Sequence, residues 1–252
     1  MKDIAKKLKR YEKRLSYRNY KEFQKMFLEF KEIIKKDNSN FTEFDRQLKI
    51  DFDKFNELLK KFLVDTFIFN IKSVIKTYTR MFGWELSKNK ISSITDVLIK
   101  HYNEKYSAKK VAKISETTRK IINNIITKSQ SEGLDLKSTM NKIMESIDGM
   151  SQYRARTIAR TETSSSINNT SLKTAKASGM KKKCWIHIGG RYTSRANHKR
   201  LNNKWIGIDE YYNLGNGIKT LCPHHPSLPA SEIINCNCLI IFKWGGVECQ
   251  IN

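Results

Sequence analysis

Residues 179–189, Gly-Met-Lys-Lys-Lys-Cys-Trp-Ile-His-Ile-Gly, mark the place where the pattern of this sequence changes. From Lys182 onward apolar and polar residues alternate, as they do in a half-buried β-strand. Before Gly179 apolar residues recur at spacings of three and four, which is typical of amphipathic helices. Glycine ends helices readily, because it adopts the left-handed conformation without a steric penalty. The sequence therefore predicts a helical first part that ends near Gly179, followed by a part of a different kind.

The first part carries a helical pattern along most of its length and contains no proline. Apolar residues at helical spacing predict a long helix over residues 50–78 that ends before Gly83. Further helices are predicted on the same grounds over residues 111–126 (ending before Gly133), 136–147 (ending at Gly149) and 151–178 (ending before Gly179, with Ser151 as an N-cap).

The part after residue 181 collects residues that interrupt regular structure: seven of the eleven glycines, all three prolines and all five cysteines. Residues 239–244, Leu-Ile-Ile-Phe-Lys-Trp, predict a final strand, and glycine and proline turns separate it from the strand that starts at Lys182. The predicted fold class is therefore α+β. A long, mainly helical N-terminal region covers residues 1–149, and a small α+β C-terminal domain, which needs the preceding helix to cover it, covers residues 150–252.

The chain is basic along its whole length. Its 48 Lys and Arg residues against 25 Asp and Glu residues give a formal net charge of +23, and no single segment accounts for the excess. Such a surface suits non-specific contact with the phosphates of double-stranded DNA, although lysines on helices are also commonly just solvated. No membrane contact is expected, because the most apolar stretch, residues 62–71, is too short for a membrane span and contains Asp65.

An arginine-rich helix precedes the first predicted strand. Arg154, Arg156 and Arg160 share this helix with Glu162. The arginines could contact phosphates, or they could buttress the C-terminal domain through buried pairs with carboxylates, and the residue types alone leave both roles open. The run that follows, residues 163–170, is too polar for an ordinary core helix, so it either faces solvent or packs through its hydroxyls. The candidate nucleic-acid-binding residues are Arg154, Arg156, Arg160, Lys181, Lys182 and Lys183.

Clustered cysteines and histidines in the C-terminal domain indicate a metal site. The chain starts without the apolar segment of a secretion signal, so its thiols are expected to be reduced, and a structural zinc ion is favoured over disulfides. Cys236 and Cys238 would point to opposite faces of a regular strand, so the alternative is that one thiol is buried and the other exposed. The candidate ligands are Cys222, His225, Cys236 and Cys238, with His198 or His224 as alternatives.

A nuclease is a second interpretation of the same residues. His198 is followed by Asn202 in a basic stretch that starts at Arg191, and further histidines lie in the same domain, which is similar to the residue types of metal-dependent nucleases. The strand-and-helix frame of such a nuclease is not evident in the sequence. Cys184 and Cys249 are interpreted as ordinary buried or terminal thiols.

Several motifs occur together and in a defined order. Arg-x-Arg-x-Ile-Ala-Arg-Thr-Glu spans residues 154–162, Arg-x-x-His spans residues 195–198, and Pro-Ala-x-Glu-x-Ile-Asn-Cys-x-Cys spans residues 229–238. Over residues 150–245 the sequence resembles the C-terminal domain of the phage Mu F-like head morphogenesis, or minor head protein, family. The residues that carry the motifs are Arg154, Arg156, Arg160, Glu162, Arg195, His198, Asn235, Cys236 and Cys238.

The resemblance implies a non-enzymatic minor capsid protein of a tailed phage or prophage. Such a protein would be made in the host cytoplasm, associate with portal and capsid or scaffold proteins during head morphogenesis, and stay in the virion beside the packaged DNA. The family usually has Arg where this chain has Asn237, and often has a Pro-Gly-Asp-Pro-like stretch where this chain has residues 222–226. The extra Cys and His in that stretch raise the expectation of a metal in this protein in particular.

Two alternatives to a minor head protein stay open from the sequence. One is a zinc-dependent nuclease, and the other is a prophage-borne, non-specific DNA-binding protein that is not part of a virion. The long helices are also compatible with a homo-oligomer.

Overall fold

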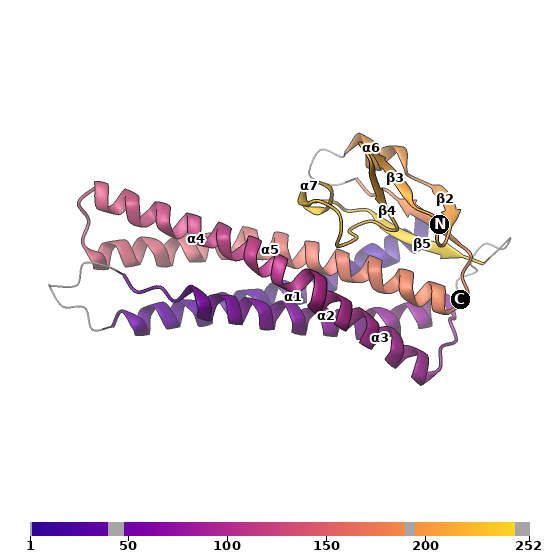
Figure 1. Cartoon of the computed structure of the whole chain (residues 1–252), viewed down its shortest axis with the longest axis horizontal. Helices are drawn as coiled ribbons and strands as arrows, with labels where there is room; N and C mark the ends of the chain where they lie inside the picture. The colour runs from indigo at the N-terminus through magenta and orange to yellow at the C-terminus, as the bar shows by residue number, and fades with distance from the viewer. Residues whose placement is uncertain (1, 40–47, 190–194, 245–252) are drawn as a thin grey trace.

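The long helices run along a common axis and form an elongated bundle, with a small strand-containing unit at one end (Figure 1). This computed structural model describes residues 2–39, 48–189 and 195–244. The predicted fold class, α+β with a long helical first part, is confirmed. The bundle consists of α1 (Lys2–Asp37), α2 (Phe52–Phe82), α3 (Lys88–Tyr102), a short π-helical turn η1 (Asn103–Ser107), α4 (Ala108–Ser131) and α5 (Leu136–Ala177).

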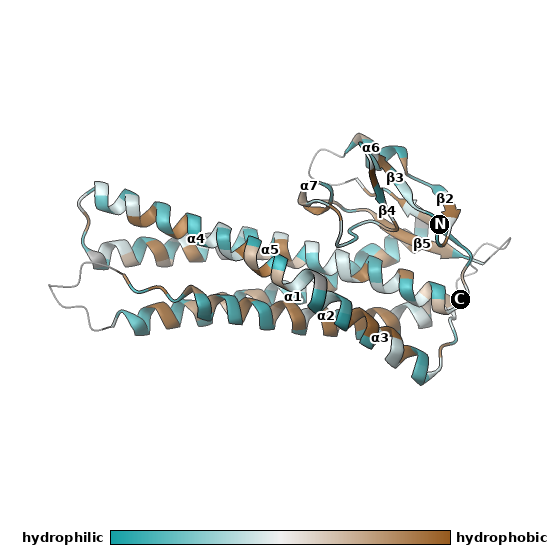
Figure 2. Ribbon diagram, viewed as in Figure 1, coloured by the Kyte–Doolittle hydropathy of each residue, from teal (hydrophilic) through white to brown (hydrophobic). Residues whose placement is uncertain are grey.

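Glycines and a capping side chain set several helix ends where the sequence predicts them. α2 begins after Asp51, whose carboxylate accepts hydrogen bonds from backbone N–H groups of the first turn, and it ends at Gly83, which has a φ of 62°. α4 and α5 end shortly before Gly133 and Gly179, with φ values of 69° and 83°. Hydrophilic and hydrophobic residues alternate along the helices, as expected when each buries one face (Figure 2). In the described part of the chain, no helix combines the length and the apolar character that crossing a membrane requires.

α5 is one continuous helix from Leu136 to Ala177, so the predicted helix end at Gly149 is wrong. A glycine inside a helix costs only about 1 kcal/mol relative to alanine. Packing outweighs that cost, because Ile147 and Ala155, on either side of the glycine, are both buried. α5 therefore crosses the predicted domain boundary, and the division of the chain into two domains stays a prediction.

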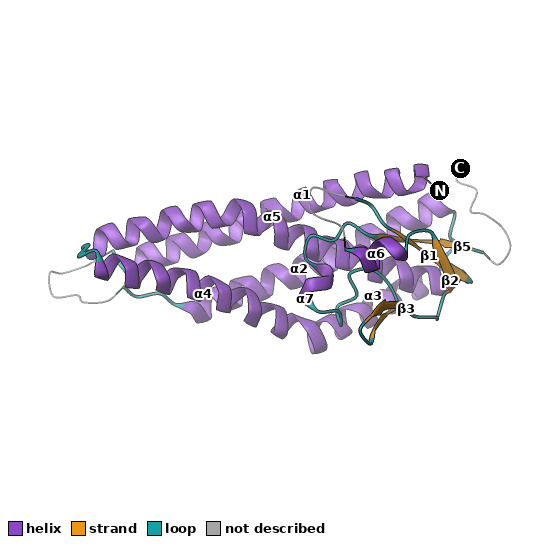
Figure 3. Ribbon diagram, turned by 90° about the horizontal axis from the view of Figure 1, so that it is seen from above, coloured by secondary structure: helices purple, strands orange, loops and turns teal. Residues whose placement is uncertain are grey.

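The strands gather at one end of the bundle (Figure 3). β1 is the middle strand of a three-stranded antiparallel sheet, between β2 and β5, and β3 pairs with β4 in a separate antiparallel hairpin. The strands predicted to start at Lys182 and Leu239 are both confirmed. The elements of this C-terminal unit are β1 (Lys182–Ile186), α6 (Ala196–Arg200), β2 (Lys204–Gly207), β3 (Tyr212–Gly215), β4 (Ile218–Thr220), α7 (Ala230–Ile233) and β5 (Leu239–Lys243).

One hydrophobic core joins the C-terminal unit to the helices. It contains Trp185 and Ile240 from the sheet, Leu172 from α5, and Ile4 and Leu8 from the first turns of α1. The unit is therefore covered by α5, as predicted, and also by the N-terminal end of the chain, which the sequence pattern does not indicate.

The polar run at residues 163–170 of α5 is largely buried and packs through its hydroxyls and amides. The amide nitrogen of Asn19 donates to the hydroxyl of Thr163 at 2.8 Å and to the amide oxygen of Asn70 at 3.0 Å. Ser164 donates to a buried carboxylate of α1. These bonds connect α1, α2 and α5, and they satisfy polar groups whose burial would otherwise be destabilising.

Candidate metal centre

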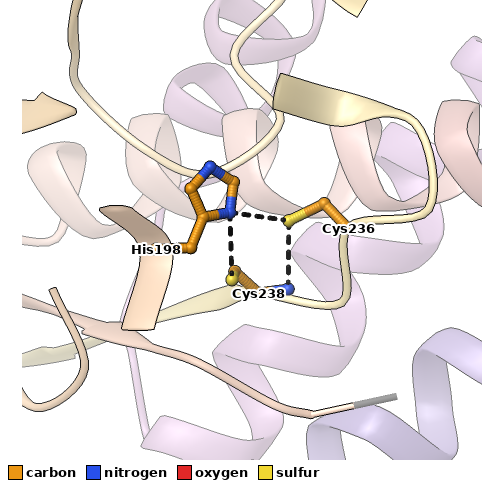
Figure 4. Close-up of side chains that lie close together, drawn as sticks. All are labelled: His198, Cys236 and Cys238. Atoms are coloured by element: carbon orange, nitrogen blue, oxygen red, sulfur yellow. Dashed lines mark hydrogen bonds between the residues drawn. The ribbon is translucent and has the colours of Figure 1, made fainter. Parts of the chain in front are cut away.

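Three side chains that are far apart in the sequence meet inside the C-terminal unit. His198 comes from α6, and Cys236 and Cys238 come from the segment between α7 and β5. The Nδ1 atom of His198 lies 3.5 Å from the Sγ atom of Cys236 and 3.6 Å from that of Cys238 (Figure 4). The exposed fractions of the three residues are 2%, 4% and 2%. The cluster is therefore closed off from solvent.

Both thiols face His198 because the backbone that carries them is not a regular strand. β5 begins only at Leu239, and Asn235, just before the cysteines, has a left-handed backbone with a φ of 59°. The resulting turn lets the N–H group of Cys238 donate to the Sγ atom of Cys236 at 3.4 Å. The expectation that a strand directs the two side chains to opposite faces is wrong, and both thiols are buried.

His198 is held from its other side. Its Nε2 atom lies 2.8 Å from a carboxylate oxygen of Glu232, and its ring packs edge-on against Trp185 with the centroids 5.2 Å apart. A carboxylate on one imidazole nitrogen fixes the tautomer and the orientation of the ring. With the proton of Nε2 directed at Glu232, Nδ1 presents its lone pair to the two sulfurs. Glu232 was not among the predicted site residues, although it lies within the motif that contains the cysteines.

Two arginines fix the segment that carries the cysteines. Arg195 donates from Nε to the carbonyl oxygen of Ser231 at 2.6 Å and from Nη2 to that of Ile234 at 2.8 Å. Arg160, on α5, donates to the side-chain oxygen of Asn235. Contacts thus connect most of the motif residues into one cluster, namely Arg160, Arg195, His198, Asn235, Cys236 and Cys238.

Two further histidines lie beside the cluster. The Nδ1 atom of His187, just after β1, is 3.4 Å from the Sγ atom of Cys238. His224 is 1% exposed, and neither of its ring nitrogens has a hydrogen-bond partner in the described part of the chain. Its backbone is left-handed, with a φ of 56°, and its carbonyl oxygen accepts hydrogen bonds from Ser165 and Asn169 of α5 at 2.9 and 3.3 Å. α5 therefore holds His224 in a conformation that is uncommon for a residue with a side chain.

The two thiols of the cluster lie close enough to shift each other's pKa in opposite directions. A hydrogen bond from the Cys238 thiol lowers the pKa of Cys236, and the nearby His224 and His198 rings lower it further. The same hydrogen bond, followed by burial, raises the pKa of Cys238 well above its ordinary value. The thiolate is the form of a cysteine that binds metals.

Two of the predicted ligands, Cys222 and His225, lie outside the cluster. The Sγ atom of Cys222 is 3.7 Å from the amide oxygen of Asn169, and burial raises its pKa to about 12. The Nδ1 atom of His225 is 2.7 Å from the hydroxyl of Ser227, and burial lowers its pKa to about 4. A hydrogen bond from α5 anchors the turn that carries both residues. Of the residues in this turn, it is His224 that lies beside the cluster. The predicted set is corrected accordingly: it keeps Cys236 and Cys238 and takes His198 in place of Cys222 and His225.

Other residues singled out in the sequence have structural positions. Cys184 is fully buried in the sheet, where burial raises its pKa to about 12. The side-chain oxygen of Asn202 accepts a hydrogen bond from the backbone N–H of His187 at 2.9 Å. Arg191 and Cys249 lie outside the described residues.

Comparisons with known sequences match the part of the chain that carries these motifs. A sequence model of the family described as Phage Mu protein F like protein matches residues 120–241. This part of the chain is similar to the phage Mu F-like family. The match starts inside α4 and ends inside β5. The Mu F-like region therefore includes the whole of α5 and begins well before residue 150, where the resemblance in the sequence starts.

A relative of known sequence comes from Bacillus subtilis (strain 168). It is described as uncharacterized protein YqbB and is 32% identical over 142 residues. The match covers 53% of this chain and 45% of the relative, so the chain spans less than half the length of the relative it matches. No solved structure matches the chain.

The other motif residues of the Mu F-like region hold α5 against its neighbours or face solvent. Arg154 donates to a threonine hydroxyl and a carbonyl oxygen of α4 at 3.2 and 3.3 Å. Glu162 accepts from Lys110 of α4 in an ion pair that is largely buried. Arg156, in contrast, is exposed, with its guanidinium 5.3 Å from a tyrosine ring of α1. Arg160 contacts the C-terminal unit through the amide of Asn235, whereas Arg154 and Glu162 contact α4. These contacts differ from the predicted buttress of the C-terminal domain by arginine–carboxylate pairs. Arg156 is the arginine that is accessible to a ligand.

The three lysines at residues 181–183 differ in exposure. Lys181 and Lys182 are exposed, whereas Lys183 is 0% exposed. The Nζ atom of Lys183 lies 5.6 Å from the centre of the Tyr212 ring and has no hydrogen-bond partner in the described residues. Burial lowers its pKa to about 8. The prediction that Lys183 contacts DNA is wrong for this structure, because both faces of β1 are covered beyond Lys182.

Proposed function

We propose that this protein is a minor head protein of a tailed phage or prophage and that it acts in head morphogenesis at the portal and procapsid. The observation that carries the proposal is the match of residues 120–241 to the Mu F-like family, whose members are phage head-related structural proteins. The cluster of motif residues supports this proposal, because the residues of the family motifs contact one another in a single region of the fold.

The proposed location follows from this role. The protein is made in the host cytoplasm, joins portal and capsid or scaffold proteins while the head assembles, and stays in the virion with the packaged genome. The long amphipathic helices of the bundle offer an extended surface for such partners or for further copies of the chain.

Non-specific contact with double-stranded DNA is part of the same proposal. The net charge of +23 supports it, because a protein that neutralises phosphates with Lys and Arg releases counterions and gains affinity regardless of base sequence. Among the six candidate residues, the side chains free to reach phosphates are the exposed ones, Arg156, Lys181 and Lys182.

The assembly role is tested in the phage or prophage that encodes the chain. Mass spectrometry of purified particles is expected to find the protein in the virion, and deletion of its gene is expected to lower the yield of filled, infectious heads. A deletion that is complemented from a plasmid provides the control. Normal, filled heads without the protein would overturn the assembly role, and absence from particles would favour a DNA-binding protein that is not part of the virion.

The DNA contact is tested by a salt titration. Binding to two unrelated DNA duplexes is expected to be equally tight at low salt and to weaken linearly on logarithmic axes as salt rises. The double variant Lys181→Gln, Lys182→Gln is expected to lower the salt slope by up to about 2, since each removed lysine leaves about one phosphate no longer neutralised. No binding at low ionic strength, or a strong preference for one duplex, would contradict this part of the proposal.

The nuclease interpretation gains no support from the geometry. A metal that cleaves DNA needs an open coordination position and access for a phosphodiester. His198, Cys236 and Cys238 are all buried, with His198 only 2% exposed.

A further inference from the structure

We propose that His198, Cys236 and Cys238 bind a structural zinc ion, with His224 as the fourth ligand. In a tetrahedral site with Zn–S near 2.3 Å and Zn–N near 2.0–2.1 Å, a sulfur and a nitrogen ligand lie about 3.5 Å apart. The distances from His198 Nδ1 to the two sulfurs are 3.5 and 3.6 Å. Both nitrogen–sulfur distances therefore match those of ligands to one zinc ion, and all three atoms lie within 4.8 Å of one another.

The surroundings of the three atoms have the form of a second shell around a metal. The N–H group of Cys238 donates to the sulfur of Cys236, and His187 lies within hydrogen-bond reach of the sulfur of Cys238, so that each sulfur has a polar partner beside it. Glu232 occupies the Nε2 side of His198, which is the carboxylate–histidine arrangement that orients an imidazole toward zinc. Ordinary buried thiols do not require any of these partners.

His224 is the best fourth ligand because it is buried beside Cys236 without a hydrogen-bond partner of its own in the described residues. An unsatisfied buried polar group costs about 1–3 kcal/mol, and a left-handed backbone adds to that cost at a residue other than glycine. Coordination of one ring nitrogen offsets both. The ring must swing toward the other ligands, because His224 is not among the residues whose ligand atoms lie within 4.8 Å of one another.

The ion acts as a structural element rather than a catalytic one. Four protein ligands close the coordination sphere, and the site is buried, so neither water nor substrate has a position on the metal. The ligands come from α6, from the turn at residues 222–226 and from the segment between α7 and β5. Zinc therefore ties together the segments of the C-terminal unit that have the least regular structure. This inference does not depend on the proposed function, since it holds wherever the protein acts.

The test is the metal content of the full-length protein. The chain is purified under reducing conditions, supplied with Zn²⁺ and freed of excess metal. Its zinc content is then measured by elemental mass spectrometry. The wild type is expected to retain about one zinc ion per chain. Cys236→Ser, Cys238→Ser and His198→Ala are expected to lose it, and His224→Ala to retain much less. His225→Ala and Cys222→Ser are the matched controls, since they change a partly or fully buried His or Cys outside the cluster and are expected to keep the metal.

Two measurements keep the proposal testable if a ligand variant fails to fold. The wild type titrated with Co²⁺ is expected to show thiolate charge-transfer absorption and the intense visible bands of a tetrahedral site. Glu232→Gln, which leaves every ligand in place, is expected to weaken zinc binding about 10–100-fold. A wild type that binds no zinc, or a cobalt spectrum without thiolate bands, would overturn the site. Loss of zinc in His187→Ala but not in His224→Ala would overturn the assignment of the fourth ligand.

Discussion

Replacing Lys183 with Met is expected to stabilise the protein at neutral pH. Lys183 is 0% exposed, and its Nζ atom has no hydrogen-bond partner in the described residues. Burial lowers its pKa from 10.5 to about 8. Because each tenfold change in proton affinity corresponds to about 1.4 kcal/mol, keeping this ammonium charged inside the fold costs about 3 kcal/mol at pH 7.

Methionine fills a similar volume without a charge and removes that cost. The variant also removes the attraction between the ammonium and the Tyr212 ring, which contributes about 0.5–1 kcal/mol. The expected net gain in the free energy of unfolding is therefore about 2 kcal/mol at pH 7.

The gain depends on pH in a direction that can be derived. Between about pH 8 and 10.5 the folded state of the wild type binds fewer protons at Lys183 than the unfolded state. The stability of the wild type at this site therefore rises as the pH rises through that window. The advantage of Lys183→Met is expected to be full below pH 8 and to be nearly lost by pH 10.5.

Urea denaturation followed by circular dichroism, at pH 7 and again at pH 9.5, measures both effects. Lys182→Met is the matched control, because Lys182 is the preceding residue of the same strand but is exposed, and its substitution is expected to change stability by less than about 0.5 kcal/mol. A Lys183→Met variant that is less stable than the wild type at pH 7, or whose advantage is unchanged at pH 9.5, would refute the reasoning.

Three other substitutions test the fold. Gly149→Ala is expected to stabilise the protein by about 0.5–1 kcal/mol in thermal unfolding, because the glycine lies inside a helix with open space around its Cβ position; a loss of stability would indicate that α5 breaks there. Gly179→Ala is expected to do the opposite, by about 1–2 kcal/mol, because its φ is +83° and a Cβ would lie 3.3 Å from the Trp244 ring. Glu162→Gln is expected to cost about 2–3 kcal/mol, since it leaves Lys110 partly buried without its carboxylate. Glu132→Gln, at an exposed pair with Lys142, is its control, and an equal loss in both variants would contradict the argument from burial.

The parts of the fold that the sequence predicts well are those set by local signals. Gly83, Gly133 and Gly179 adopt left-handed conformations next to helix ends, and glycine is the residue that does this without strain. The strand that starts at Lys182 is likewise predicted, although β1 is buried on both faces and not half-buried as its alternation indicates. Gly149 carries the same local signal, but packing of the flanking turns keeps the helix intact, and that packing involves residues far away in the sequence.

The sequence indicates that a cluster of Cys and His residues exists, but it does not indicate which of these residues form it. Reduced Cys and His residues gathered in a short, irregular region indicate a metal-type cluster. Which of them meet depends on contacts that no spacing reveals, such as the anchoring of the turn at His224 by Ser165 and Asn169. The same limit explains Lys183, since a lysine next to two exposed lysines is buried by elements that come from elsewhere in the chain.

The core shared by the two ends of the chain has a consequence for the order of folding. Ile4 and Leu8 pack in the same cluster as Ile240, so this cluster cannot close until almost the whole chain has been synthesised. The cluster around Phe23 and Phe55 needs only the first two helices at its centre and can form earlier. Closing the larger loop is entropically more costly and slower. The newly made chain therefore folds its bundle first, and the core shared by its two ends packs last. A fragment that begins at residue 150 lacks the N-terminal helix that contributes to this core.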